Sequence, residues 1–279
     1  MKLRRNSHHY ITISVDLYEK NSQWIRDYIT DLPYCWSTIT YSVSNYGTAS
    51  ASDVQYTVYV NGDIYLQNTI STLASQASFS DQFSVQMEYD DQCQISLVAS
   101  CGDSNDTVSF VHEATLPRSP ASANLKKLYI TPDDQIVKNT ADEIMQEKFL
   151  LYPGWMAIKD WVATNIEYSY DSHIHGTRDY WQLPQETIQS GYGDCEDFSI
   201  LMVSLLRAAG WSIDEAYVVV GCETEGGCHA WVRLNVDIIG WQNLEPQYGT
   251  AGWLFLQDFF WLGSFDDVYG FNDVDYESL

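Results

Sequence analysis

The residues of this chain that could do chemistry together are a cysteine, a histidine and a carboxylate, which follow one another in the order of a Cys-His-acid triad. Cys195 comes after a Gly-Asp turn and opens an apolar run, and His229 and Glu245 follow it. In such a triad the thiolate attacks a carbonyl carbon, the histidine exchanges the proton, and the acid orients the imidazole. The pattern therefore predicts an enzyme with a cysteine nucleophile.

Two opposing fields act on the predicted nucleophile. We expect Cys195 in the first turn of a helix, where unpaired backbone N–H groups and the positive end of the helix dipole favour the thiolate. Asp194, Glu196 and Asp197 crowd the same turn, and their negative charge raises the pKa of the thiol. A histidine cation at His229 would have to restore the balance.

The helix that presents Cys195 is the strongest helical pattern in the chain. Its apolar face consists of Phe198, Leu201, Met202, Leu205, Leu206 and Ala209. Gly210 stands in the position of a C-cap glycine and should end the helix. Strands are predicted at 216–220, 229–234 and 241–244. The helix, a turn and two strands could return His229 to the N-terminus of the helix, and the third strand could bring Glu245 alongside.

The rest of the chain divides into two parts. Residues 11–113 carry strand patterns between turn signals such as Asn61-Gly62, which predicts an all-β sandwich and resembles the immunoglobulin-like modules of microbial surface proteins. Helical spacing begins beyond it, at 136–149 and 158–166. The stretch 116–123, rich in proline and small residues, is typical of a linker. We therefore expect a sandwich domain over 1–118 and a catalytic domain over 119–279.

The motifs around the triad resemble the transglutaminase-like superfamily. In chain order they are DYWQLPQET at 179–187, GDCEDF at 193–198, LLRAAG at 205–210, HAWV at 229–232 and LEP at 244–246. The likeness covers about residues 132–246 and implies an α+β fold, a papain-like catalytic core preceded here by the immunoglobulin-like sandwich. It also implies Cys195 as nucleophile, His229 as general base and acid, and Glu245 as the orienting acid.

The acid departs from the family pattern, which usually has aspartate before that proline. The longer side chain of Glu245 can still reach an imidazole nitrogen, as Asp/Glu alternation in other triads shows. Asp237 is the other acid within reach along the chain, but we expect it in a hairpin turn.

The oxyanion site needs N–H donors aimed at the developing charge, and the backbone N–H of Cys195 is one natural donor. Trp181 resembles an aromatic position of the family and could supply its indole N–H, although a buried tryptophan more often belongs to the core. The side-chain amides of Gln182 and Gln189 are further candidates.

Metal binding has two candidate sites. Asp194, Glu196 and Asp197 resemble the acidic cluster that certain calcium-dependent periplasmic members of the family use to hold an ion. The alternative is that Asp194 caps the helix and the other two acids favour its dipole. A zinc set of Cys195, Cys222, Cys228 and His229 is weak, and a disulfide is favoured over it. We expect no required cofactor, with calcium at the acidic cluster as the alternative. His173 and His175 are interpreted as part of a polar loop.

The six cysteines bear on the compartment. Cys93 with Cys101, and Cys222 with Cys228, each bracket a short segment and could form local disulfides, which would leave Cys35 and Cys195 unpaired. The alternative is six reduced cysteines. The polar composition, poor in lysine, favours an extracellular or cell-surface protein, although neither a signal peptide nor a membrane-spanning helix is recognisable in the sequence.

The charge of the chain excludes some partners. Fourteen basic and 38 acidic side chains give a net charge of −24, which repels nucleic acid and anionic membrane surfaces. We expect a protein or peptide substrate, no nucleic acid and no stable membrane insertion. The predicted function is cysteine-dependent acyl transfer on peptide, isopeptide or amide bonds through a thioester on Cys195, with hydrolysis preferred to cross-linking. The alternative is a surface adhesion or binding module that keeps the fold without the chemistry.

Overall fold

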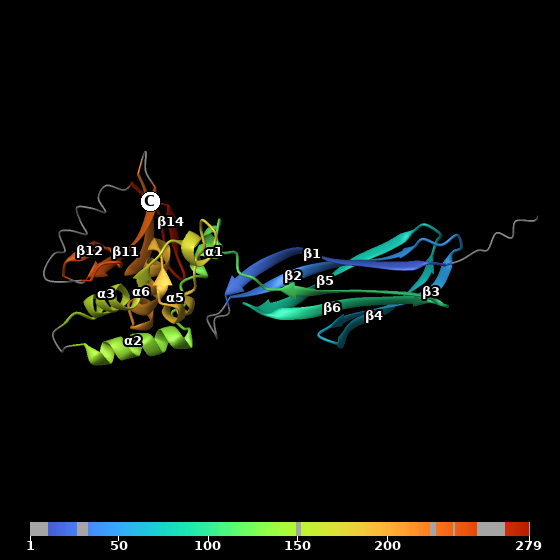
Figure 1. Cartoon of the computed structure of the whole chain (residues 1–279), viewed down its shortest axis with the longest axis horizontal. Coiled ribbons are helices and arrows are strands. Elements are labelled where there is room, and N and C mark those ends of the chain that lie inside the picture. Colours follow the sequence, from blue (N-terminus) through green and yellow to red (C-terminus); the bar gives the residue numbers. More distant parts are fainter. Residues whose placement is uncertain are drawn as a thin grey trace, which may run out of the picture. The chain divides into compact units, whose positions relative to one another are not determined.

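The structure is a computed structural model that describes residues 11–26, 33–148, 152–223, 227–236, 238–249 and 266–278 (Figure 1). Its contacts divide the chain into two compact units. The first comprises Met1–Ile25 and Pro33–Leu116, and the second comprises Arg26–Leu32 and Pro117–Leu279.

The first unit is a sandwich of two sheets, which confirms the predicted all-β fold (Figure 1, blue to green). One sheet has the strand order β1-β2-β5 and the other β4-β3-β6-β7. The strands are β1 (Ile13–Arg26), β2 (Pro33–Asn45), β3 (Ala51–Val60), β4 (Asp63–Leu73), β5 (Ser78–Glu88), β6 (Gln92–Cys101) and β7 (Ser104–Glu113). Alternate residues of β6 (Cys93, Ile95, Leu97 and Ala99) are buried, as expected for a strand with one face on the core.

Two short features of this unit test the sequence predictions. Asn61 and Gly62 have φ values of 53° and 88°, the left-handed conformations of a tight hairpin turn between β3 and β4. The predicted turn is therefore confirmed.

The suggested disulfide between Cys93 and Cys101 is wrong, because both thiols are free and lie near opposite ends of one strand. A strand that rises about 3.3 Å per residue keeps them far beyond bonding distance.

The second unit packs helices against an antiparallel sheet of order β12-β11-β10-β13-β14. Its helices are α1 (Ala123–Lys127), α2 (Gln135–Glu147), α3 (Gly154–Asn165), α4 (Asp171–Ile174), α5 (Pro184–Ser190) and α6 (Cys195–Ala208). Its strands are β8 (Glu167–Tyr168), β9 (Tyr192–Gly193), β10 (Ala216–Cys222), β11 (Cys228–Val236), β12 (Gly240–Leu244), β13 (Asp266–Phe271) and β14 (Tyr276–Ser278). Helices and sheet together give the predicted α+β architecture.

Helix α6 is the centre of this unit. It packs against α2, α3 and α5 on one side and against β10 and β11 on the other. All residues from Glu196 to Leu206 are buried, so the helix is enclosed rather than amphipathic. Gly210, with φ 104°, follows its last turn and confirms the predicted helix end. The N-terminus of α6 is thereby fixed beside the sheet.

The other predicted elements of this unit are also present. Helices α2 and α3 occupy the two predicted helical segments, although Phe149, at the end of the first segment, lies outside the described residues. Asp237, the alternative acid expected in a hairpin turn, also lies outside them. The predicted strands correspond to β10, β11 and β12. His173 lies in the short helix α4, in a segment that we interpreted as a loop.

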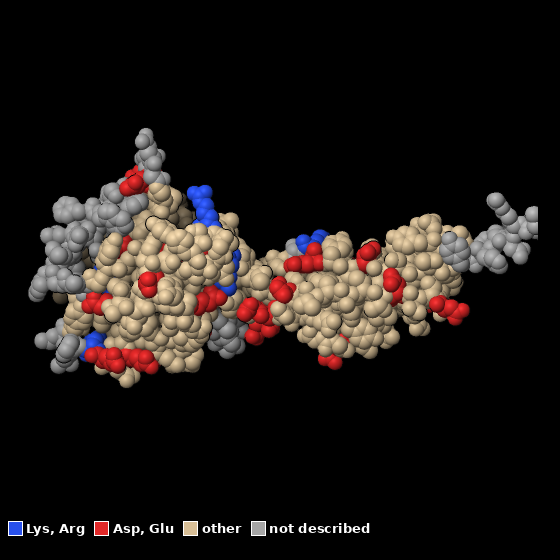
Figure 2. Space-filling view, in the orientation of Figure 1, with Lys and Arg blue, Asp and Glu red and all other residues tan. Residues whose placement is uncertain are grey.

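The excess of acidic over basic side chains in the sequence is also visible on the surface of the folded chain (Figure 2). Figure 2 shows acidic side chains on the visible face of each unit and few basic ones. No helix in the described ranges is long and apolar enough to cross a membrane.

Candidate active site

The predicted nucleophile is the first residue of α6. Cys195 is half-buried and its thiol is free. Its Sγ lies 3.2 Å from Oε2 of Glu196, and the backbone N–H of Ala230 on β11 faces the sulfur. The thiol is therefore held between the helix N-terminus and the strand that carries His229.

His229 and Glu245 form a close, buried side-chain pair in the site. Nε2 of His229 lies 2.6 Å from Oε2 of Glu245, and the two side chains are 11% and 1% exposed. Strands β11 and β12 are antiparallel, with Val232 opposite Leu244. If this pairing is continued by one residue, Glu245 lies opposite Trp231, two residues from His229. The glutamate then reaches the imidazole diagonally. The backbone N–H of Gln247 donates to its other oxygen at 3.1 Å.

A pocket of about 260 Å³ brings three of the four predicted site residues together. Its walls include Cys195, His229 and Trp181, while Glu245 lies buried behind the histidine. The remaining lining residues are Pro120, Lys126, Asp179, Glu196, Val220, Cys228, Ala230 and Tyr269. A larger hollow of about 690 Å³, on the sheet beside Tyr217, has none of the four predicted site residues in its described lining.

Trp181 is fixed by its neighbours. Its ring stacks on Phe271 with centroids 5.6 Å apart and meets Tyr129 edge-on at 5.5 Å. Only 6% of the residue is exposed, and it still lines the pocket. Trp181 is thus both a packed aromatic residue and a wall of the site.

The two glutamines considered as oxyanion donors lie elsewhere. The side-chain N–H groups of Gln182 donate to Asp197 at 2.7 Å and to the carbonyl of Tyr192 at 3.0 Å. Gln189 is exposed on α5 and is not among the described residues that line the pocket.

The electrostatics of the site oppose thiolate formation. Burial, followed by the carboxyls of Glu196 and Asp194, raises the pKa of the Cys195 thiol well above its usual range, and the N–H of Ala230 acts in the opposite direction. Burial also raises the pKa of Glu196. It raises that of Asp197 to about 8, against the lowering effect of the N–H groups of Gln182.

The acidic cluster is larger than the sequence suggested. Ligand atoms of Asp171, Asp194 and Asp197 lie within 4.8 Å of one another, as do those of Asp171, Asp179 and Glu196. Asp171 is 1% exposed, and within the described structure its Oδ1 and Oδ1 of Asp194 are buried without a hydrogen-bond partner. Buried carboxylate oxygens that lack donors are suited to a hard cation such as Ca²⁺. The donor set therefore fits calcium.

Asp171 and Asp179 were not among the acids that the sequence analysis singled out. Strands β8 and β9 pair in parallel with Tyr168 opposite Gly193. Asp171 follows the first strand and Asp194 the second, so the pairing draws both acids to the start of α6. A two-residue parallel bridge has no signature in the sequence, and for this reason the complete cluster was missed.

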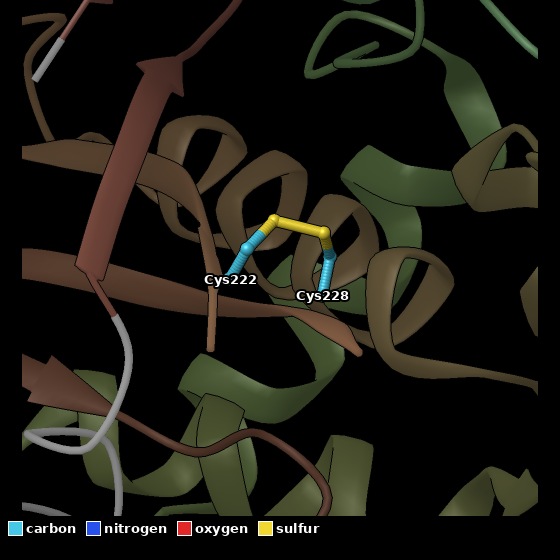
Figure 3. Close-up of a disulfide and its surroundings, with 2 residues drawn as sticks. All are labelled: Cys222 and Cys228. Atoms are coloured by element: carbon cyan, nitrogen blue, oxygen red, sulfur yellow. A yellow bond between two sulfur atoms is a disulfide. The ribbon is translucent and has the colours of Figure 1, made fainter. Parts of the chain in front are cut away.

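The cysteine pair next to His229 is oxidised. Cys222 and Cys228 form a disulfide that joins the end of β10 to the start of β11 (Figure 3). The disulfide confirms one of the two predicted local bridges and excludes the zinc set, because neither sulfur is available as a thiolate ligand. Cys35 is a buried free thiol of the first unit.

Comparisons with known proteins agree with this geometry. The model of the transglutaminase-like superfamily matches residues 138–246, and that of CARDB matches residues 32–113. No curated protein matches the chain.

Three solved structures with low identity illustrate the similarity. Calcium-bound LapG of Legionella pneumophila is 18% identical, with a TM-score of 0.37, over 57% of this chain and 81% of its own. A candidate cysteine protease of Cytophaga hutchinsonii is 14% identical, with a TM-score of 0.37, over 91% and 83%. A CARDB domain of Pyrococcus furiosus in complex with di-metal ions is 14% identical, with a TM-score of 0.31, over 39% and 97%.

The superfamily match spans Cys195, His229 and Glu245 and supports a cysteine-based enzyme at this coarse level. Residues 32–113 of the chain thus match the CARDB model, and residues 138–246 match the model of the transglutaminase-like superfamily.

Proposed function

We propose that the second unit catalyses acyl transfer on peptide, isopeptide or amide bonds through a thioester on Cys195. The observation that carries this proposal is the buried His229–Glu245 pair, 2.6 Å apart, whose imidazole shares a pocket with the thiol of Cys195. A histidine held by a carboxylate beside a cysteine at a helix N-terminus is the arrangement that nucleophilic acyl transfer needs.

The two ring nitrogens of His229 have different partners in the proposed mechanism. Because Glu245 binds Nε2, the nitrogen that exchanges a proton with Cys195 is Nδ1. The thiolate attacks the carbonyl carbon, the C–N bond breaks, and the amine leaves with the proton that His229 took from the thiol. Water then attacks the thioester carbonyl with His229 as the base, the C–S bond breaks, and the carboxylic acid leaves. His229 returns the proton to the thiolate and restores the thiol.

The oxyanion site is proposed to use the backbone N–H of Cys195 together with the indole of Trp181. The first donor belongs to the unpaired first turn of α6. The second is supported by the position of Trp181 in the pocket wall and by the two aromatic rings that fix its orientation.

Hydrolysis is the proposed outcome, since water is by far the most concentrated acceptor and the half-reaction that forms the thioester is the same for any acceptor. The test is to supply the chain with a p-nitrophenyl ester, alone and with an excess of a primary amine. Hydrolysis predicts that the free acid remains the main product in both cases. Quantitative amide formation would show a cross-linking enzyme instead.

Calcium is proposed to bind the cluster of Asp171, Asp194 and Asp197, with Asp179 and Glu196 beside them. The support is the orphaned oxygens of Asp171 and Asp194. A bound divalent cation would supply positive charge next to carboxylates that raise the pKa of the thiol.

The second candidate function is a surface adhesion or binding module without catalysis. The raised pKa of the Cys195 thiol favours it. Alkylation by iodoacetamide separates the two functions, with half-buried Cys101 as an internal reference. An enzyme predicts that Cys195 reacts faster than Cys101 at neutral pH when calcium is present, and a binding module predicts that it does not.

The proposed substrate is a protein or peptide encountered outside the cytoplasm, in a secreted or surface setting. The Cys222–Cys228 disulfide and the CARDB domain support this location.

A further inference from the structure

The pocket of Cys195 contains a buried lysine that the proposed mechanism does not use. Lys126 belongs to α1, is 8% exposed, and lines the pocket together with Cys195 and His229. Its Nζ donates to the carbonyl of Pro120 at 2.7 Å. The ammonium group lies 5.0 Å from the ring centroid of Tyr269 and 6.0 Å from that of Trp181.

This ammonium group has N–H donors that its carbonyl partner does not use. It carries three N–H donors, and the Pro120 carbonyl takes one of them. Within the described residues no carboxylate oxygen forms an ion pair with it. The two aromatic faces compensate only part of the cost of burying a charge. An anion that entered the pocket would offset the free-energy cost of burying the charge and would accept hydrogen bonds from the remaining donors.

The other charged groups of the pocket face different partners. Glu196 accepts from the thiol of Cys195 at 3.2 Å, and Asp179 accepts from the hydroxyl of Ser119. Both acids also belong to the carboxylate cluster described above. Lys126 is the only lysine or arginine in the described lining of the pocket.

We propose that Lys126 is a specificity-determining residue that binds a carboxylate of the acyl substrate, close to the carbonyl that Cys195 attacks. The preferred substrates are then peptides or amides with an acidic side chain or a free carboxylate at that position. The inference rests on the proposed function of Cys195, and it adds the chemical class of the substrate.

Two alkylating reagents of similar size test this role without knowledge of the substrate. Iodoacetate carries a carboxylate and iodoacetamide is neutral, and both react with cysteine thiols. The rates at Cys195 and Cys101 are measured by peptide mapping of the full chain in EGTA. The ratio of the iodoacetate rate to the iodoacetamide rate should be about tenfold higher at Cys195 than at Cys101, because Cys195 shares its pocket with the buried lysine and Cys101 lies in the first unit.

Three variants assign the effect to the lysine. Lys126→Gln and Lys126→Met should lower the ratio at Cys195 to that of Cys101, and Lys126→Arg should keep most of it. Lys127→Met is the matched control, because this neighbour on α1 donates to the carbonyl of Val274 and does not line the pocket. Its ratio should equal that of the wild type.

Equal ratios at Cys195 and Cys101 in the wild-type chain would overturn the inference even if no variant folded. An unchanged ratio in a folded neutral variant at position 126, or an equal loss in Lys127→Met, would also overturn it. Failure of the proposed function has a different signature. Cys195 would then show ordinary thiol reactivity with iodoacetamide in calcium, whatever the ratio of the two reagents.

Discussion

Glu245 is a buried carboxylate whose described partners are one imidazole nitrogen and one backbone N–H. It keeps the Nε2 side of His229 occupied. In the proposed mechanism it would stabilise the imidazolium that forms when the thiol loses its proton, and would thus act through the charge of His229 rather than by contact with the substrate.

Replacement of Glu245 by glutamine tests that role. Glu245→Gln keeps the size of the side chain and removes its charge, so the burst of p-nitrophenol from p-nitrophenyl acetate should slow by about 10²-fold to 10⁴-fold. The control is Glu143→Gln, an exposed acid of α2. An unchanged burst rate in Glu245→Gln would show that the pair is structural.

Asp171 makes the stability of the metal-free chain depend on pH. Burial, followed by the charge of Asp194, raises its pKa from 3.8 to about 6. The folded state then binds more protons than the unfolded state between these values, so the stability contribution is complete below about pH 4 and is lost as pH rises through about 6.

Thermal unfolding in EGTA and in calcium, from pH 4 to pH 8, measures this effect. In EGTA the melting temperature should fall across that window, and calcium should raise it more at pH 7 than at pH 5 because the ion binds ionised carboxylates. Asp171→Asn should flatten the fall and reduce the gain from calcium. Asp142→Asn, on the exposed face of α2, should change neither. A calcium shift that Asp171→Asn leaves intact would place the ion elsewhere.

The residues of the proposed triad could be singled out because each stands in a local motif, and the structure brings His229 against Glu245 and into one pocket with Cys195. Asp171, Asp179 and Lys126 could not be, since they reach the site from three separate segments and no spacing rule joins them to Cys195. The side chain of Gln182 was a reasonable oxyanion donor by position, but its bonds to Asp197 could be seen only in the folded chain.

At the scale of elements, the hairpin of β10 and β11 carries His229 directly after a disulfide. Cys228 is exposed and the bridge spans a sequence separation of 6, so it restrains the end of the hairpin that delivers the imidazole. The short loop limits its contribution to stability to about 2 kcal/mol.

The double variant Cys222→Ser/Cys228→Ser should therefore unfold at a temperature about 4–8 °C lower, and the acylation burst should slow because His229 is less firmly held. Cys101→Ser provides the matched control, since this thiol lies in the first unit and is free. A variant with normal stability and a normal burst would mean that strand pairing alone positions the histidine.

Long, strongly patterned elements were the predictable ones. Both helix α6 and its C-terminal end were predicted, because a long apolar run with helical spacing that is followed by a glycine such as Gly210 favours a helix over a strand or a loop. The segment around Cys93 was misread as a clipped hairpin, because alternation alone does not reveal whether a strand continues. Strands β13 and β14 complete the sheet from an acidic, aromatic segment in which the sequence analysis predicted no strand.

At the scale of the whole molecule, the chain contains a sandwich unit and a second, α+β unit that each have buried cores. The core cluster of the sandwich draws only on residues of the first unit. Every residue of the proposed site belongs to the second.

A chain that begins at residue 117 should consequently fold and keep the acylation burst within about twofold of the full chain. The full chain should show two unfolding transitions by calorimetry, of which calcium shifts only the one that the shortened chain retains. Loss of the burst in a folded 117–279 chain would show that the sandwich contributes to catalysis.

The most direct test of the account is whether an acyl group forms on Cys195 and depends on His229. The chain is mixed with p-nitrophenyl acetate in calcium, quenched in acid at short times, and mapped by mass spectrometry. We predict a hydroxylamine-labile acetyl group on Cys195 that appears and decays in the wild type, is absent from Cys195→Ala, and forms at least about 10²-fold more slowly in His229→Gln. Acetylation confined to other residues, or equally fast at Cys195 in His229→Gln, would contradict the account.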